Sequence, residues 1–146
     1  LQDKKHQSDK ELIHYLINAA GYGSNLLLNV GPMPNGEIQP EHIASLKSIG
    51  RWLDQHGETI YGTRQGPVAP SGSMVSTQKN EVVYLHLLDG QKDTYLIPHF
   101  TGKIKKIVFY SNGKKLAHKV NEFGLTFAVP KEYRDDIDTI ITMELK

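Results

Sequence analysis

The spacing of hydrophobic and polar residues divides the chain into a helical first third and a β-rich remainder. Residues 12–20 carry apolar side chains three and four positions apart, which predicts an amphipathic helix. A second stripe of this kind runs through residues 40–56. Between the two stripes, residues 25–30 are almost continuously apolar and precede Gly31 and Pro32, which predicts a short buried strand. The order helix, strand, helix is typical of a parallel α/β sheet or barrel.

Local signals mark the ends of both predicted helices. Ser8 and Glu11 fit a capping box, so the first helix is expected to begin directly after the serine. Gly21 and Gly23 are expected to end it, because glycine adopts the left-handed conformation at low cost. Pro40 suits the first position of the second helix, and Gly57 is expected to close that helix.

Side chains alternate along the predicted strand, so its two faces differ in chemistry. One face carries Leu26, Leu28 and Val30, and the other carries Asn25, Leu27 and Asn29. We expect the helices to cover the apolar face, and the two amides then need hydrogen-bond partners of their own. A single strand is not stable without neighbours. Because the chain starts at Leu1, without an initiator Met or a signal peptide, we expect a processed or truncated piece of a larger protein.

The pattern changes after Thr63, where a passage rich in Gly, Pro and Ser predicts a domain boundary. Short β-type runs then recur at residues 74–77, 82–88, 94–97, 104–110, 125–129 and 139–145. Asn112 and Gly113 form a strong hairpin signal between two of these runs. Several short strands separated by turns predict an antiparallel β-sandwich over residues 64–146, with residues 1–63 as a separate unit.

The overall composition narrows the classes of function. The 146 residues are 38% hydrophobic and 23% charged, and the net charge is +1. This balance gives no large electrostatic field, so we expect no nucleic-acid partner and no membrane partner. No apolar run in the sequence reaches the length of a membrane span. The absence of cysteine excludes disulfides and thiolate metal sites.

Residues suited to catalysis or metal binding are present without a recognisable motif. The seven histidines lack a compact ligand spacing such as H-E-x-x-H, so we expect ordinary surface or hydrogen-bonded histidines. Asp135, Asp136 and Asp138 cluster before the last predicted strand, and we expect turn or solvation roles for them. The sequence contains no phosphate loop, dinucleotide fingerprint or G-x-S-x-G motif, and it predicts no cofactor and no metal site.

The position of one residue along the predicted strand indicates a candidate substrate-binding site. Ligands of parallel α/β folds bind at the carboxyl ends of the strands. Asn29 is the last residue on the face away from the helices, so it is a candidate to bind a substrate hydroxyl or to support a catalytic group. In the alternative interpretation its amide only holds the following loop. Met33 is expected to border the same substrate-binding pocket.

Four motifs in a fixed order resemble a known family. They are Asn-Leu-Leu-Leu-Asn-Val-Gly-Pro at residues 25–32, Asn-Gly-Glu-Ile-Gln-Pro at 35–40, Ile-Gly-Arg-Trp-Leu at 49–53 and Gly-Glu-Thr-Ile-Tyr-Gly-Thr at 57–63. This order resembles the C-terminal part of the α-L-fucosidases of glycoside hydrolase family 29. The resemblance implies an α+β fragment, in which residues 1–63 are the last strand and helices of a (β/α)8-like catalytic barrel. Residues 64–146 would then be the C-terminal antiparallel β-sandwich of the family.

The resemblance also implies a function for the parent protein. It would be a retaining exo-α-L-fucosidase that hydrolyses terminal α-L-fucose from glycans with two carboxyl groups. In the family both carboxyl groups come from earlier barrel strands and loops, so no catalytic residue maps onto this chain, and the 146-residue chain alone is expected to be inactive. The implied partners are fucosylated glycans and the remainder of the barrel, and the implied location is secreted, periplasmic or lysosomal.

A second interpretation comes from a different class of function. The β-rich region is then a stand-alone sandwich that binds carbohydrate or acts as a structural module, with the helical segment as an adaptor. Such a binding module is expected to expose aromatic side chains on one sheet face. The candidates are Tyr84, Tyr95, Phe100, Phe109 and Tyr110. Strand parity can instead place most of them in the core.

Overall fold

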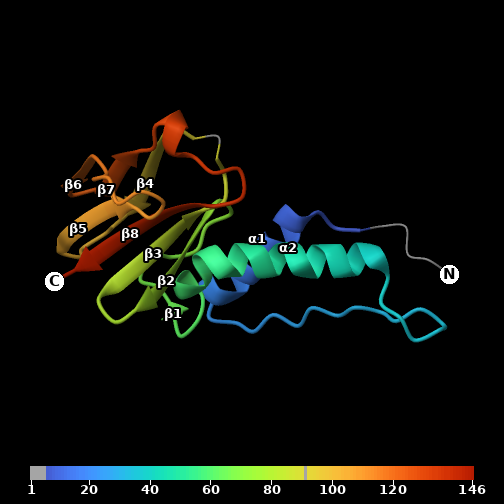
Figure 1. The fold of residues 1–146 in the computed structure, drawn as a ribbon. Helices are drawn as coiled ribbons and strands as arrows, with labels where there is room; N and C mark the ends of the chain where they lie inside the picture. The colour runs from blue at the N-terminus through green and yellow to red at the C-terminus, as the bar shows by residue number, and fades with distance from the viewer. Residues whose placement is uncertain (1–5, 91) are drawn as a thin grey trace.

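The computed structural model describes residues 6–90 and 92–146, and Figure 1 shows their fold. This part of the chain contains two α-helices, α1 (Asp9–Gly21) and α2 (Pro40–His56), followed by eight β-strands. Short 3-10 turns, η1 (Gly57–Thr59) and η2 (Lys131–Tyr133), follow α2 and β7. In the same part of the chain, no helix has the length and apolar character needed to cross a membrane.

The signals at the helix starts act as the sequence predicts, and of the two glycines expected to end α1 only Gly23 has a positive φ (66°). The hydroxyl of Ser8 accepts a hydrogen bond from the backbone N–H of Glu11 (3.3 Å), and the Glu11 carboxylate accepts one from the backbone N–H of Ser8 (2.8 Å). These reciprocal bonds form the predicted capping box. Pro40 is the first residue of α2, where its missing N–H has no helical partner to lose.

Residues 25–30 do not form the predicted buried strand. Residues 24–31, which we call the open segment, run extended from the end of α1 back along the helices (Figure 1). Leu27 is 83% exposed, and Leu26 and Leu28 are each 38% exposed, so the apolar face is only partly covered. A strand requires hydrogen bonds to a neighbouring strand, and the described residues provide no such neighbour here. The predicted alternation of faces persists, since the central leucine is far more exposed than the leucines on either side.

The remaining strands form two antiparallel sheets within the described residues. The five-stranded sheet has the order β1 (Arg64–Gln65), β2 (Met74–Lys79), β3 (Val82–Leu87), β8 (Thr139–Leu145), β5 (Ile104–Phe109). The three-stranded sheet has the order β4 (Thr94–Pro98), β7 (Gly124–Ala128), β6 (His118–Asn121). Six of these strands match predicted runs, whereas the short strands β1 and β6 have no predicted counterpart.

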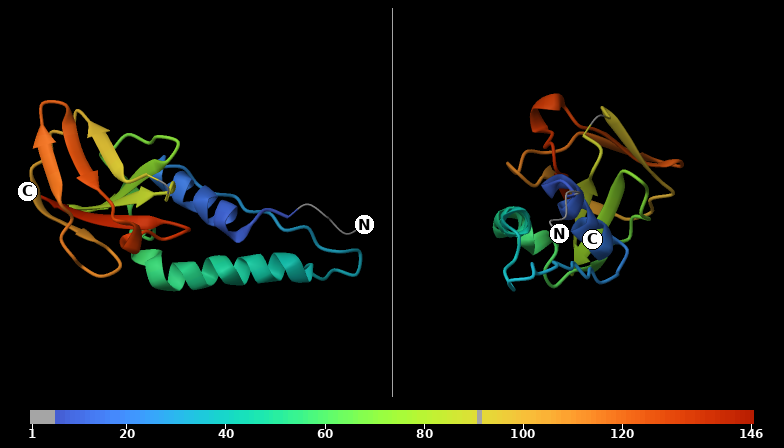
Figure 2. Two further views of the ribbon diagram at one scale, coloured as in Figure 1. Left: turned by 90° about the horizontal axis from the view of Figure 1, so that it is seen from above. Right: turned by 90° about the vertical axis from the view of Figure 1, so that its right-hand side faces the viewer.

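Strand parity divides the buried residues between two cores. On β3, Val83 and Leu85 point into a core shared with the three-stranded sheet, whose members include Leu125 and Phe127 of β7. The alternate residue Tyr84 points to the other face, where it packs with Ile13 and Ile17 of α1 and Trp52 of α2. The five-stranded sheet is therefore the middle layer, with the second sheet on one face and the helices on the other (Figure 2).

The passage of Gly, Pro and Ser after Thr63 is packed more closely than a loose linker. Val68 lies buried in the core between the sheets. Its backbone N–H donates to the Ser76 hydroxyl (3.1 Å), and this hydroxyl donates to the Val68 carbonyl (3.1 Å). The chain crosses from the helical part to the β-rich part through an ordered connection.

Candidate functional site

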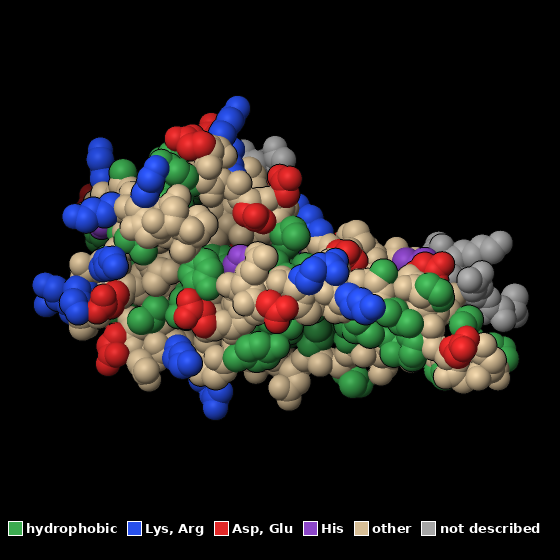
Figure 3. Space-filling view, in the orientation of Figure 1, with side chains coloured by type: hydrophobic (Ala, Val, Ile, Leu, Met, Phe, Trp, Pro, Cys, Tyr) green, Lys and Arg blue, Asp and Glu red, His purple; other side chains and the backbone are tan. Residues whose placement is uncertain are grey.

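Asn29 lies in the open segment and lines a groove of about 760 Å³ between that segment and both helices. The groove is lined by His6, Gln7, Glu11, Leu12, Leu28, Asn29, Val30, Gly31, His42, Ser45 and Leu46. The Asn29 side chain is exposed, and the side chain of Asn35 bonds to Glu37 in the turn that follows. Figure 3 shows apolar side chains gathered over the helical part of the molecule, around this region.

Met33 lies in the turn that follows the open segment, and it is not a lining residue of the groove. Its backbone N–H donates to the carbonyl of Glu37 (2.7 Å), and its carbonyl accepts from the N–H of Gly36 (2.8 Å). The predicted pocket depends on a strand at residues 25–30, and the described residues form no strand there. Substrate binding by Asn29 and Met33 therefore stays a prediction.

Two buried polar atoms near the start of α2 lack hydrogen-bond partners among the described residues, and one of them belongs to a residue that lines the groove. His42 Nδ1 is buried and has no hydrogen-bond partner among the described residues, and the same holds for Gln39 Nε2 just before α2. The His6 and His42 rings meet edge to face, with their centroids 5.3 Å apart. Within the described part of the chain, no three His, Cys, Asp or Glu side chains are placed to hold a metal ion. Buried donors and acceptors in proteins are normally paired, so these two atoms are exceptions among the described residues.

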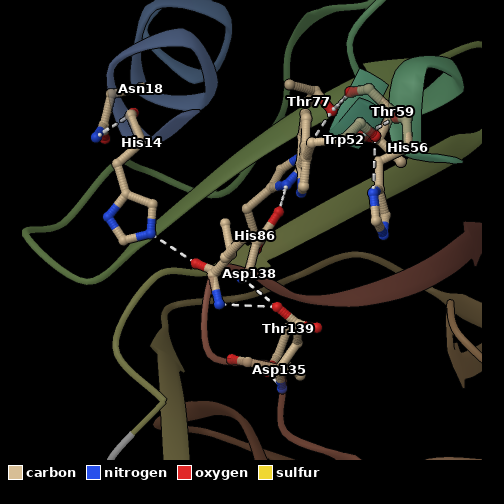
Figure 4. A network of polar contacts seen from close by, with 11 residues as sticks. His14, Asn18, Trp52, His56, Thr59, Thr77, His86, Asp135, Asp138 and Thr139 are labelled. Carbon is tan, nitrogen blue, oxygen red and sulfur yellow. Dashed lines mark hydrogen bonds and ion pairs between the residues drawn. The ribbon is translucent and has the colours of Figure 1, made fainter. Parts of the chain in front are cut away.

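A second cluster of polar side chains lies buried between the middle sheet and the helices (Figure 4). His86 Nδ1 is 2.6 Å from Asp138 Oδ2, and His86 Nε2 is 3.3 Å from the Thr77 hydroxyl. The Thr77 hydroxyl in turn donates to the carbonyl of Thr59 (2.6 Å). The side chains of His86 and Asp138 are 0% exposed.

The cluster resembles a catalytic triad, with Thr77 in the place of the nucleophile, His86 in that of the base and Asp138 in that of the acid. The hydrogen bonds of these residues exclude catalysis by such a triad. The single proton of the Thr77 hydroxyl goes to the Thr59 carbonyl, so it is not available to His86. His86 must then donate from Nε2 to Thr77 rather than accept a proton from it. Since these side chains are also buried, a substrate has no access to them, and the cluster is structural.

The same hydrogen bonds constrain the charge of the His86–Asp138 pair. With Nε2–H donating to Thr77, either Nδ1 is also protonated and faces a carboxylate, or Nδ1 is bare and accepts from a protonated Asp138. The first arrangement pairs a cation with an anion, and the second pairs two neutral groups. The pair has zero net charge in both arrangements, which limits the cost of burying it.

The expectation for the aspartate cluster is correct for Asp135 and wrong for Asp138. The Asp135 carboxylate accepts hydrogen bonds from the backbone N–H groups of Ile137 (2.8 Å) and Asp138 (3.1 Å), as in a turn. Asp138 is instead buried against His86, 52 positions earlier in the chain. The one sequence signal for this pair was the alternation of His86 with apolar residues, since a histidine on a buried strand face requires a polar partner.

Comparison with known proteins supports the resemblance seen in the motifs. Residues 1–58 match the family described as alpha-L-fucosidase. The alpha-L-fucosidase of Branchiostoma floridae is 37% identical over 83 residues, which are 54% of this chain and 18% of that protein. The plasma alpha-L-fucosidase of Homo sapiens is 32% identical over 114 residues, 75% of this chain and 24% of that protein. The chain thus spans about a quarter or less of the length of these relatives.

Solved structures show the same fold over nearly the whole chain. Alpha-L-fucosidase isoenzyme 1 from Paenibacillus thiaminolyticus superposes with a TM-score of 0.85 at 24% identity, over 99% of this chain and 36% of that one. The Thermotoga maritima alpha-fucosidase in complex with a mechanism based inhibitor gives a TM-score of 0.82 at 25% identity, over 94% and 35% of the two chains. The chain belongs to the α-L-fucosidase family, and it matches a C-terminal part of the family's members.

Proposed function

We propose that this chain is the C-terminal portion of a retaining exo-α-L-fucosidase, which hydrolyses terminal α-L-fucose from glycans. One observation carries the proposal, the 32% identity to the human plasma alpha-L-fucosidase over 114 residues. A match of that length exceeds the helical first third, so it includes part of the β-rich region as well. The proposed partners of the chain are the rest of the catalytic barrel and, through the whole enzyme, fucosylated glycans.

The helical part is proposed to complete a (β/α)8-like barrel, and the β-rich part to be a C-terminal β-sandwich domain. Two helices flank the open segment in the order that a barrel repeats. The segment has unpaired backbone groups and a leucine that is 83% exposed, so neighbouring strands on both sides would satisfy it. In the β-rich part, two antiparallel sheets enclose one hydrophobic core, as in a β-sandwich.

The chain is proposed to lack both catalytic carboxyl groups. A retaining glycosidase places its two carboxyl groups about 5 Å apart, and its general acid has a raised pKa. Near the groove, Glu11 accepts hydrogen bonds from the backbone and hydroxyl of Ser8, which lower the pKa of Glu11. Glu37 is bonded to the side-chain amide of Asn35 (2.8 Å) in an exposed turn. Both carboxylates are thus explained by local structure.

The alternative of a stand-alone binding module has no comparable support. Of the five aromatic residues nominated for an exposed binding face, Tyr84, Tyr95 and Phe109 are buried. Phe100 and Tyr110 are partly buried and pack against the two hydrophobic cores. Three of the rings thus lie in the interior and the other two pack against it.

Hydrolysis of an aryl α-L-fucoside by the full-length protein and by the 146-residue chain tests the proposal. We expect turnover by the full-length protein and none by the chain alone. A folded full-length protein that is inert on fucosides but hydrolyses another glycoside would refute the substrate. Turnover by the chain alone, abolished by Glu37→Gln or Glu11→Gln, would show that the catalytic groups lie in these residues after all.

A further inference from the structure

The two helices overlap the middle sheet near their carboxyl ends, and their amino ends extend beyond it (Figures 1 and 2). At this contact Gly21 approaches β2 so closely that an added Cβ would lie 2.5 Å from the Cβ of Val75. The direction in which the helices leave the sheet is therefore set by a small region of contact. The polar contacts within that region constrain this direction, because hydrogen bonds are directional and apolar packing is not.

One hydrogen bond to a backbone carbonyl lies on the side of each helix. From α1, His14 Nε2 donates to the carbonyl of Ile137 (2.6 Å), which directly precedes Asp138. On the side of α2, the Thr77 hydroxyl of β2 donates to the carbonyl of Thr59 in η1 (2.6 Å). His86 connects these two points, because its ring lies between Thr77 and Asp138.

An aromatic stack adjoins this network. The ring of Trp52 in α2 stacks on that of His56, with centroids 4.9 Å apart, and His56 contacts Tyr110 after β5 at 5.8 Å. Burial, followed by a hydrogen bond to Glu58, raises the pKa of Tyr110 to about 12. A cavity of about 50 Å³ is lined by His56 and Tyr110 of the stack and by Asp138 of the network. The stack and the network therefore belong to one region of contact.

We propose that Thr77, His86 and Asp138 form a joint that fixes the two helices on the five-stranded sheet. The three side chains bridge β2, β3 and the start of β8, and they reach η1 directly and α1 through the adjoining Ile137 carbonyl. Because the pair is buried and each ring nitrogen is engaged, removal of one member leaves another donor or acceptor unpaired. The joint holds the helical layer on the sheet. None of its three residues belongs to the hydrophobic core between the two sheets.

Thr77→Val tests the joint at small steric cost, since it removes the hydroxyl and keeps the branched shape. Backbone amide exchange of the 146-residue chain, followed by mass spectrometry, is expected to be on the order of tenfold faster in α1 and α2. Exchange in β4 and β7 is expected to stay unchanged. Emission of Trp52, the single tryptophan, is expected to shift to longer wavelength as the helix end becomes more exposed to water.

Two further variants provide the controls. Thr77→Ser keeps the hydroxyl and is expected to restore most of the protection in the helices. Thr126→Val makes the same change on the outer face of β7, away from the helices, and is expected to leave exchange in α1 and α2 unchanged. Equal helix exchange in Thr77→Val and Thr126→Val would overturn the proposal. A rise in exchange that is as large in β4 and β7 as in the helices would also overturn it.

Coupling within the joint is a second, independent measurement. Asp138→Asn removes the carboxylate that faces His86, so the helices are expected to lose protection as in Thr77→Val. If the three residues act as one unit, the double variant loses less protection than the sum of the two single losses. Strict additivity would show two unrelated contacts and would contradict the joint.

Discussion

Gly21 shows how one residue can serve two purposes at a helix end. It is the last residue of α1, and it is buried against Val75 of β2. The sequence identifies the first role from the position of glycine after the helical stripe. The second role depends on a contact 54 positions away along the chain, which no local pattern contains.

We predict that Gly21→Ala destabilises the chain by about 1–3 kcal/mol, because the added methyl group overlaps Val75. Gly50→Ala is the matched control, since Gly50 lies within α2 and an added Cβ meets no atom within 4 Å. The control is expected to stabilise the chain by about 0.5–1 kcal/mol through helix propensity. Urea unfolding followed by circular dichroism measures both. Stabilisation by both substitutions would contradict the close approach of α1 to β2.

Asn29 is the residue of this chain that we expect to matter most for substrate. Asn29→Ala in the full-length enzyme is predicted to lower kcat/KM for an aryl α-L-fucoside roughly tenfold or more, the cost of one lost polar contact. Asn25→Ala is the control, because Asn25 has the same chemistry on the same face at the opposite end of the open segment. Equal losses in the two variants would place the effect in folding of the segment rather than in substrate binding.

At the scale of elements, helices and most strands follow from local patterns. Helix α1 begins at its predicted capping box and α2 begins at its predicted Pro40, because these signals depend on residues within one turn. The prediction of a strand at residues 25–30 is wrong, because a strand depends on distant partners. The described residues contain no neighbouring strand that could form a ladder with this segment. The short strands β1 and β6 also escape prediction, because two to four residues carry too little periodicity to recognise.

The capping box of α1 makes its stability depend on pH. The backbone and hydroxyl of Ser8 lower the pKa of Glu11 in the folded state, so the charged form contributes stability above its unfolded pKa. That contribution is lost as the pH falls through the lowered folded value. We predict that stability falls less between pH 5 and pH 3 in Glu11→Gln than in the unsubstituted chain. An identical pH profile for the two proteins would show that the box has no energetic effect.

At the scale of the whole molecule, a sheet of five strands separates two kinds of packing. The core between the sheets is closed by residues of this chain alone, and its members could be predicted from strand parity. The helical layer has an open side, where Leu27 is exposed and the groove lies. The His86–Asp138 pair could not be predicted, because it joins segments that are far apart in sequence.

Amide exchange in the open segment tests most directly whether the chain completes a larger barrel. The account predicts fast exchange at residues 26–30 in the 146-residue chain, because their backbone groups lack a ladder. In the full-length protein the same amides are expected to be among the slowest to exchange, since strands on both sides would bond them. Fast exchange at these residues in the folded, full-length protein would contradict the account.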